Sequence, residues 1–171
     1  PMKGIFSLAA LCLFAGEILA VPRYGIRSWG IEEGLPSSRV VAIDQGKDGR
    51  LWLGTSRGLS AFDGIEFYHF NHVTNPELGA SDLTSVVISP EGWVWFSDRS
   101  GEVGYFDGNE FHDVEISLIE GDDYVVSLAI SQSGLVVAAT RDGYLLELHP
   151  NQPSVIWKSS QWFQLSRDFS P

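Results

Sequence analysis

A segment of about 42 residues occurs three times along this chain, and this repetition limits the possible folds more than any other feature. The copies are clearest in three glycine-bounded stretches: "DGRLWLGTSRGLSAFDG" (48–64), "EGWVWFSDRSGEVGYFDG" (91–108) and "SGLVVAATRDGYLLELHP" (133–150). Corresponding glycines are separated by 43 and then 42 residues, as in Gly49, Gly92 and Gly134. A period of this length predicts a stack of similar units, each built from a few secondary-structure elements.

Each copy is predicted to form four short antiparallel strands. In the first copy these strands cover 39–45, 50–55, 58–62 and 66–70, with a glycine-containing turn after each of the first three. The fourth strand of the third copy is predicted at 154–157. One such sheet cannot bury both of its apolar faces, so sheets of this kind stack face to face around an axis as the blades of a β-propeller. The sequence therefore predicts an all-β fold of about three four-stranded blades.

The period also predicts how the chain is divided. The predicted segments are a lead-in (21–37), three blades (38–80, 81–121 and 122–158) and the start of a further blade (159–171). Propellers of this type usually close with about seven blades, so we expect an incomplete propeller that is the N-terminal part of a longer protein. A complete protein of three units is the alternative, but the terminal units of a repeat protein normally need polar caps.

The first 20 residues have the composition of a secretory signal peptide. Lys3 is followed by an apolar stretch over 5–14 and by small residues that end at Ala20, where cleavage is predicted. A buried hydrophobic helix is the alternative interpretation. Because the single cysteine, Cys12, lies in this segment, the mature chain would contain no disulfide, thiolate metal site or cysteine nucleophile. An exported protein, periplasmic or otherwise extracytoplasmic, is expected.

The charge and the motifs of the chain exclude several classes of function. The formal net charge is −11, which disfavours binding to nucleic acid. No nucleophile elbow, phosphate-binding loop or zinc-protease motif occurs. His69 and His72 lie three residues apart where a strand runs into a loop, which is poor geometry for one metal ion. The sequence therefore predicts no catalytic constellation, no metal site and no cofactor.

Arginines recur at one predicted edge of the blades. In a four-stranded blade, the turn between the second and third strands lies on the same rim as the connection between blades. Arginines are predicted in both places: Arg39, Arg57, Arg99 and Arg141. Guanidinium groups pair bidentately with carboxylate or sulfate, so these four residues are the candidate site for an anionic ligand. The alternative is that they keep polar turns soluble, and a binding site would further require a pocket.

The first copy also carries a family resemblance. Its pattern, "DG.LW.GT..GL..FDG..F", resembles the two-component-regulator propeller repeat, which is found in periplasmic sensor regions of bacterial hybrid histidine kinases and related receptors. The lead-in "YGIRSWGIEEGLPSSRVVAI" (24–43) resembles the start of such sensors. The resemblance extends over residues 24–148 and weakens from the first copy to the third. It implies that a strand around Tyr24 to Trp29 completes the last blade of the propeller.

The resemblance implies a non-catalytic module that senses a ligand outside the cytoplasm and signals through a two-component-type receptor. It further implies a small-molecule or oligosaccharide ligand, the remaining blades of the same receptor as partners, a receptor homodimer, and a membrane anchor and kinase downstream. The segment "PEGWVWFSD" (90–98) also resembles repeats of streptogramin lyases, which are propeller enzymes whose catalytic histidine and glutamate lie in later blades. A secreted scaffold propeller is the third interpretation.

Overall fold

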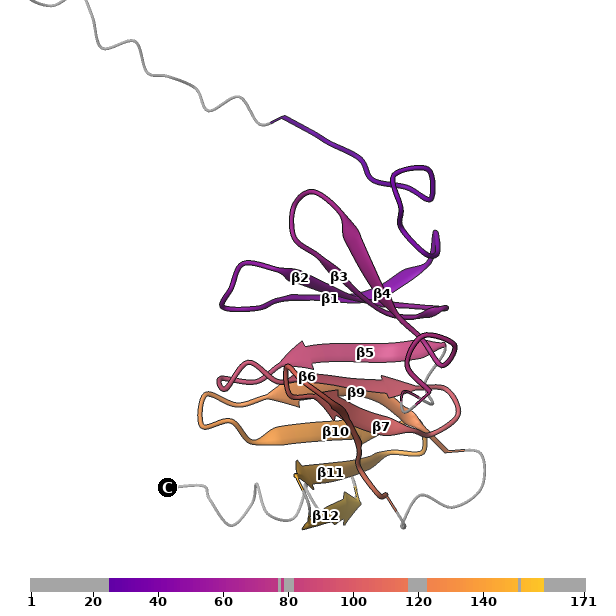
Figure 1. Cartoon of the computed structure of the whole chain (residues 1–171). Helices are drawn as coiled ribbons and strands as arrows, with labels where there is room; N and C mark the ends of the chain where they lie inside the picture. The colour runs from indigo at the N-terminus through magenta and orange to yellow at the C-terminus, as the bar shows by residue number, and fades with distance from the viewer. Residues whose placement is uncertain (1–24, 77, 79–81, 117–122, 151, 159–171) are drawn as a thin grey trace, which may run out of the picture.

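The computed structural model describes residues 25–76, 78, 82–116, 123–150 and 152–158. Within these residues the chain forms three antiparallel sheets of four strands, and each sheet is built from consecutive strands (Figure 1). The predicted signal peptide and the predicted start of a further blade lie outside the described residues. No helix in the described part of the chain is long and apolar enough to cross a membrane.

Sheet 1 consists of β1 (Val40–Gln45), β2 (Leu51–Thr55), β3 (Gly58–Phe62) and β4 (Phe67–Phe70). Sheet 2 consists of β5 (Leu83–Ile88), β6 (Val94–Asp98), β7 (Val103–Phe106) and β8 (Phe111–Asp113). Sheet 3 consists of β9 (Val125–Ile130), β10 (Val136–Thr140), β11 (Tyr144–His149) and β12 (Gln152–Lys158). The four strands predicted for the first copy are confirmed, each to within one residue at its ends.

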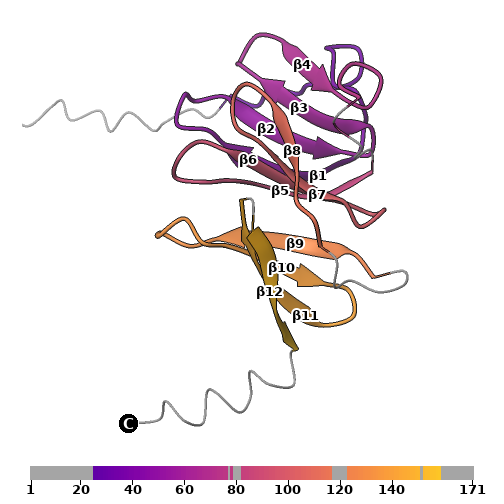
Figure 2. The same cartoon turned by 60° about the horizontal axis from the view of Figure 1, so that its bottom comes forward.

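The three sheets stack in chain order, with their first strands side by side: β1 contacts β5, and β5 contacts β9 (Figures 1 and 2). This arrangement confirms the all-β prediction of three four-stranded antiparallel blades. Apolar side chains fill the space between neighbouring sheets, because each sheet turns one apolar face toward the next. Trp52 is buried between sheets 1 and 2, and Trp95 is buried in the core shared by sheets 2 and 3.

Polar side chains also connect the first strands of neighbouring sheets. The backbone N–H of Ile88 donates to Asp44 Oδ2 over 2.8 Å, which links sheet 2 to sheet 1. Thr84 Oγ1 donates to the carbonyl of Val125 over 2.6 Å, and the N–H of Leu128 donates to Ser85 Oγ over 3.0 Å. These bonds give hydrogen-bond partners to backbone groups that would otherwise be buried between the sheets without one. They also fix the position of each sheet on the next.

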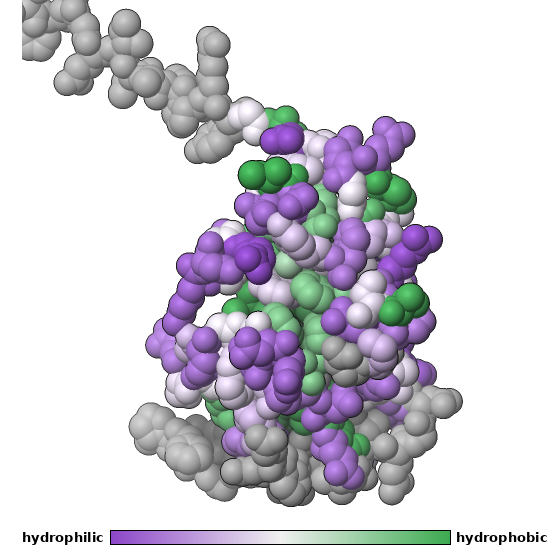
Figure 3. All heavy atoms as spheres, viewed as in Figure 1, coloured by the Kyte–Doolittle hydropathy of each residue, from purple (hydrophilic) through white to green (hydrophobic). Residues whose placement is uncertain are grey.

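The lead-in segment covers the face of sheet 1 that points away from sheet 2. Trp29 packs edge-on against Phe62 at a ring-centroid distance of 5.2 Å, and Leu35 is buried beside Leu53. Residues 25–29 form no strand, so the closing strand that the family resemblance implies around Tyr24 to Trp29 stays a prediction. The space-filling view shows exposed hydrophobic side chains at this end of the molecule (Figure 3), and Ile26 and Ile31 are among the exposed large apolar residues.

Candidate functional site

The structure places the four predicted arginines on one rim of the stack, hereafter the arginine rim (Arg39, Arg57, Arg99 and Arg141). Backbone hydrogen bonds define equivalent positions there, because Ser56, Arg99 and Arg141 each donate an N–H to the residue before the first strand of their sheet. Arg99 and Arg141 are therefore equivalent, whereas Arg57 lies one position later in its turn. The residues that accept these bonds are Arg39, Asp82 and Tyr124.

Asp82 forms ion pairs with two of the four arginines. Its carboxylate lies 3.1 Å from Arg99 Nε and 3.5 Å from Arg39 Nη1, so one acid bridges the arginines of sheets 1 and 2. All three side chains are well exposed to solvent, and such exposed ion pairs contribute about 0–1 kcal/mol each. Arg39 and Arg99 are thus paired within the protein, and a ligand would have to compete with Asp82 for them.

Arg57 and Arg141 differ from this pair. Both are exposed, and neither has an ion-pair partner among the residues that the structure describes. Arg57 lines a surface depression of about 510 Å³ together with His72 and Thr74. The loop beneath is ordered by Asn71, whose Oδ1 accepts the N–H groups of residues 73 and 74. The Thr74 hydroxyl is engaged within this loop, so the guanidinium of Arg57 and the imidazole of His72 are the groups around the depression that can bind a carboxylate or sulfate.

The opposite rim carries acidic residues, and carboxylates there stabilise turns. Asp63 accepts the N–H groups of Ile65 and Glu66, and Asp107 accepts those of Asn109 and Glu110. The backbone hydrogen bonds lower the pKa of Asp63, and they lower the pKa of Asp107 to about 2, with a further contribution from the His112 side chain. These acids satisfy the backbone N–H groups of the turns between the third and fourth strands.

The Asp107→Asn variant is expected to be less stable than the parent at pH 7 and to approach it in acid. A carboxylate whose pKa is lowered on folding stabilises the protein at pH values above its pKa in the unfolded state, which is about 3.8. This contribution is lost as the pH falls toward the folded-state pKa of about 2. Urea denaturation at pH 7, 5, 4 and 3 measures the difference. The Glu110→Gln variant controls for the loss of a neighbouring charge, and a difference that stays constant over this range would contradict the assignment.

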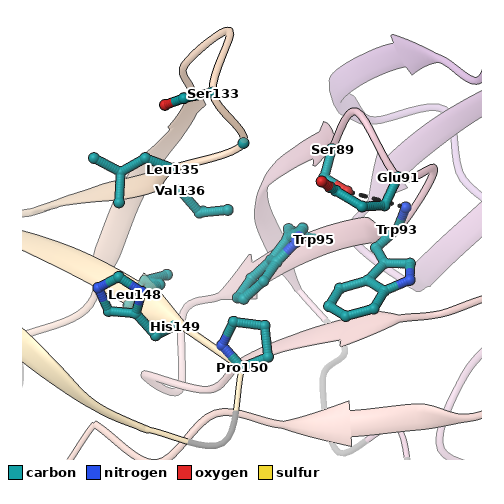
Figure 4. A pocket seen from close by; sticks show the side chains of 11 residues that line it. Ser89, Glu91, Trp93, Trp95, Ser133, Leu135, Val136, Leu148, His149 and Pro150 are labelled. Atoms are coloured by element: carbon teal, nitrogen blue, oxygen red, sulfur yellow. Dashed lines mark hydrogen bonds between the residues drawn. The ribbon is translucent and has the colours of Figure 1, made fainter.

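Among the pockets on this acidic rim, two lie at the junctions between neighbouring sheets, and sequence reasoning missed both. The first junction pocket, between sheets 1 and 2, has a volume of about 370 Å³ and is lined by Lys47, Asp48, Arg50 and Trp52 among others. The second junction pocket, between sheets 2 and 3, has a volume of about 410 Å³ (Figure 4). Its lining includes Ser89, Glu91, Trp93, Trp95, Leu148 and His149. The feature of the sequence that could have indicated the second pocket is Trp93, an aromatic residue at the position where the first copy has Arg50.

Comparison with known proteins identifies the repeat. Residues 34–57 match the family model described as two component regulator propeller. This stretch of the chain is similar to the two-component-regulator propeller repeat. A curated relative, histidine kinase P4 of Formosa agariphila, is 36% identical to the chain over 84 residues, which are 48% of this chain and 6% of the relative. The chain therefore matches only a small part of that longer protein.

Solved structures share the fold of the propeller repeats. An extracellular domain assigned to the hybrid two-component system BT3049 of B. thetaiotaomicron matches with a TM-score of 0.66 and 19% identity, over 78% of this chain and 20% of that one. Virginiamycin B lyase of Staphylococcus aureus matches with a TM-score of 0.58 and 12% identity, over 71% of this chain and 41% of that one. At these identities the structural matches establish the fold alone, and they include both a receptor domain and an enzyme.

Proposed function

We propose that this chain is part of an extracytoplasmic propeller that senses a ligand for a two-component-type receptor, and that it is itself non-catalytic. The observation that carries the proposal is the propeller repeat at residues 34–57, together with the 36% identity to a histidine kinase. No group of three or more metal-ligating side chains gathers in the described part of the chain. The remaining blades, a downstream membrane anchor and kinase, and a receptor homodimer belong to the same proposal.

The arginine rim is the proposed contact surface, and its chemistry favours an anionic ligand such as an oligosaccharide that carries carboxylate or sulfate groups. Arg57 and Arg141 offer exposed guanidinium groups without an ion-pair partner among the described residues, and Arg57 lines a depression large enough for one sugar residue. In this mechanism the ligand binds one receptor state more tightly than the other, and the population shifts toward the state it prefers. The kinase would respond to that shift.

Opposite effects are expected from two substitutions in the full-length receptor. Arg57→Ala is expected to weaken binding of a uronate oligosaccharide by about tenfold, the loss of one charge-assisted contact. Asp82→Asn is expected to strengthen binding, because it releases Arg39 and Arg99 from their internal partner. Isothermal titration calorimetry with the oligosaccharide and with its neutral methyl ester measures both effects. The proposed role of the arginine rim would be overturned if the receptor bound the charged and the neutral sugar equally well. It would also be overturned if the parent receptor and the two variants all bound the oligosaccharide with the same affinity.

A further inference from the structure

The two junction pockets occupy equivalent places in successive sheets. Arg50 and Trp93 immediately precede the second strands β2 and β6, and Trp52 and Trp95 are the second residues of these strands. Phe106 of the first pocket corresponds to Leu148 of the second, because they pair with Val94 and Val136 respectively. The stacking of the sheets therefore produces a pocket at each junction. What differs between the pockets is the chemistry of their walls.

The second junction pocket has an aromatic wall. Trp93 stacks on Tyr105 at a centroid distance of 5.0 Å and an interplanar angle of 13°, and Trp95 lies 4.8 Å from the same ring. Trp95 is fully buried, whereas Trp93 is only partly buried at the pocket wall (Figure 4). The packing against Tyr105 fixes the orientation of the Trp93 indole. An indole held in this way offers an electron-rich surface, to which cations are attracted.

The charge of the second junction pocket is negative. Neither lysine nor arginine lines it, and the Glu91 carboxylate lies against the β9–β10 turn, where a Cβ added at Gly134 would be 3.3 Å from Glu91 Oε1. A hydrogen bond with Ser89 lowers the pKa of Glu91, so this group is ionised at neutral pH. Glu91 has no ion pair with any described residue, although Lys47 of the neighbouring junction lies close enough to contribute to its pKa. His149 Nε2 lies 3.9 Å from Glu147 Oε2.

We propose that the second junction pocket binds a small organic cation, an ammonium group with apolar substituents, with Trp93 as its aromatic contact and Glu91 as its counter-ion. The pocket volume suits a ligand of this size, and Leu135 and Pro150, which line the pocket and are only partly buried, provide apolar surface for the substituents. The first junction pocket is less suited to a cation, because Lys47 and Arg50 line it beside the carboxylates of Asp48 and Glu91, and Arg50 stands at the position of Trp93. This site is independent of the proposed function, since it lies on the rim opposite the arginines and selects the opposite charge.

Choline is the probe, and 3,3-dimethylbutanol is its uncharged isostere. Calorimetric titration of the full-length protein is expected to show choline binding at least about tenfold tighter than the neutral alcohol. Trp93→Leu places at this position the residue that the third copy carries at Leu135, and it is expected to weaken choline binding by at least about tenfold. Glu91→Gln alters an exposed side chain of the same shape and is expected to weaken it several-fold, less so at high salt.

Arg50→Leu is the matched control, because it changes the equivalent position of the first junction pocket and should leave choline binding unchanged. Circular dichroism and the Tm of each variant report whether it is folded. Equal affinity for choline and its neutral isostere would show a merely apolar pocket and overturn the proposal. Absence of choline binding, or binding that survives in both Trp93→Leu and Glu91→Gln, would also overturn it. None of these outcomes bears on the arginine rim, which is tested with an anionic sugar.

Discussion

Replacing Trp95 with alanine is expected to lower the free energy of unfolding by about 3–5 kcal/mol. The Trp95 side chain is 1% exposed and belongs to the core that joins sheets 2 and 3, where it packs on Tyr105. Its removal would leave a cavity that the β-strands on either side cannot fill, because their positions are fixed by the hydrogen bonds within each sheet. Urea denaturation followed by circular dichroism measures the loss.

Trp93→Ala is the matched control for this experiment. Trp93 contacts the same tyrosine but is only partly buried, so a clearly smaller loss of stability is expected. If Trp95→Ala does not fold, Trp95→Phe keeps most of the buried volume and is expected to show an intermediate loss. Equal losses for the two alanine variants would contradict the expectation that the buried Trp95 contributes more to the core between sheets 2 and 3 than the partly buried Trp93 does.

The second large effect is expected for Gly58→Ala, which should cost about 2–5 kcal/mol. Gly58 has a φ of +109°, and a Cβ at this position would lie 2.5 Å from the carbonyl oxygen of Phe70. The substitution therefore combines backbone strain with a clash against β4 that no side-chain rotation can relieve. Thermal or urea denaturation of the variant measures the combined cost.

Gly64→Ala separates these two contributions. Gly64 has a similar φ of +99°, but a Cβ there would meet no atom within 4 Å. Only the backbone strain remains, and the expected cost is about 1–2 kcal/mol. A Gly58→Ala variant as stable as Gly64→Ala would show that β4 can move away from the turn, and that the fourth strand is held less firmly than its pairing with β3 indicates.

The strands could be predicted because their determinants are local. Short apolar runs and glycines such as Gly58, whose turns need a positive φ, recur in the sequence at a fixed period. The lead-in could not be predicted in the same way. Trp29 packs on Phe62 of sheet 1, whereas the pairing implied for the segment around it concerns a blade that the described residues do not include.

The candidate site was predictable only in part. Topology alone placed the four arginines on one rim, since connections of the same kind always emerge from the same edge of a sheet. The pairing of Arg39 and Arg99 with Asp82 depends on side chains from two sheets that meet at the junction, and no spacing in the sequence encodes it. The junction pockets were missed for a similar reason, because they arise from the gap between sheets and not from any one strand.

The hydrogen bonds in which the Asp44, Thr84 and Ser85 side chains take part have a mechanical consequence. They tie each sheet to the next along the first strands, on the side where β1, β5 and β9 meet. We therefore expect any change in the angle between neighbouring sheets to pivot about these strands and to produce its largest displacement at the outermost strands, β4, β8 and β12. A molecule that wedges two sheets apart would be sensed most strongly there, at the circumference of the stack.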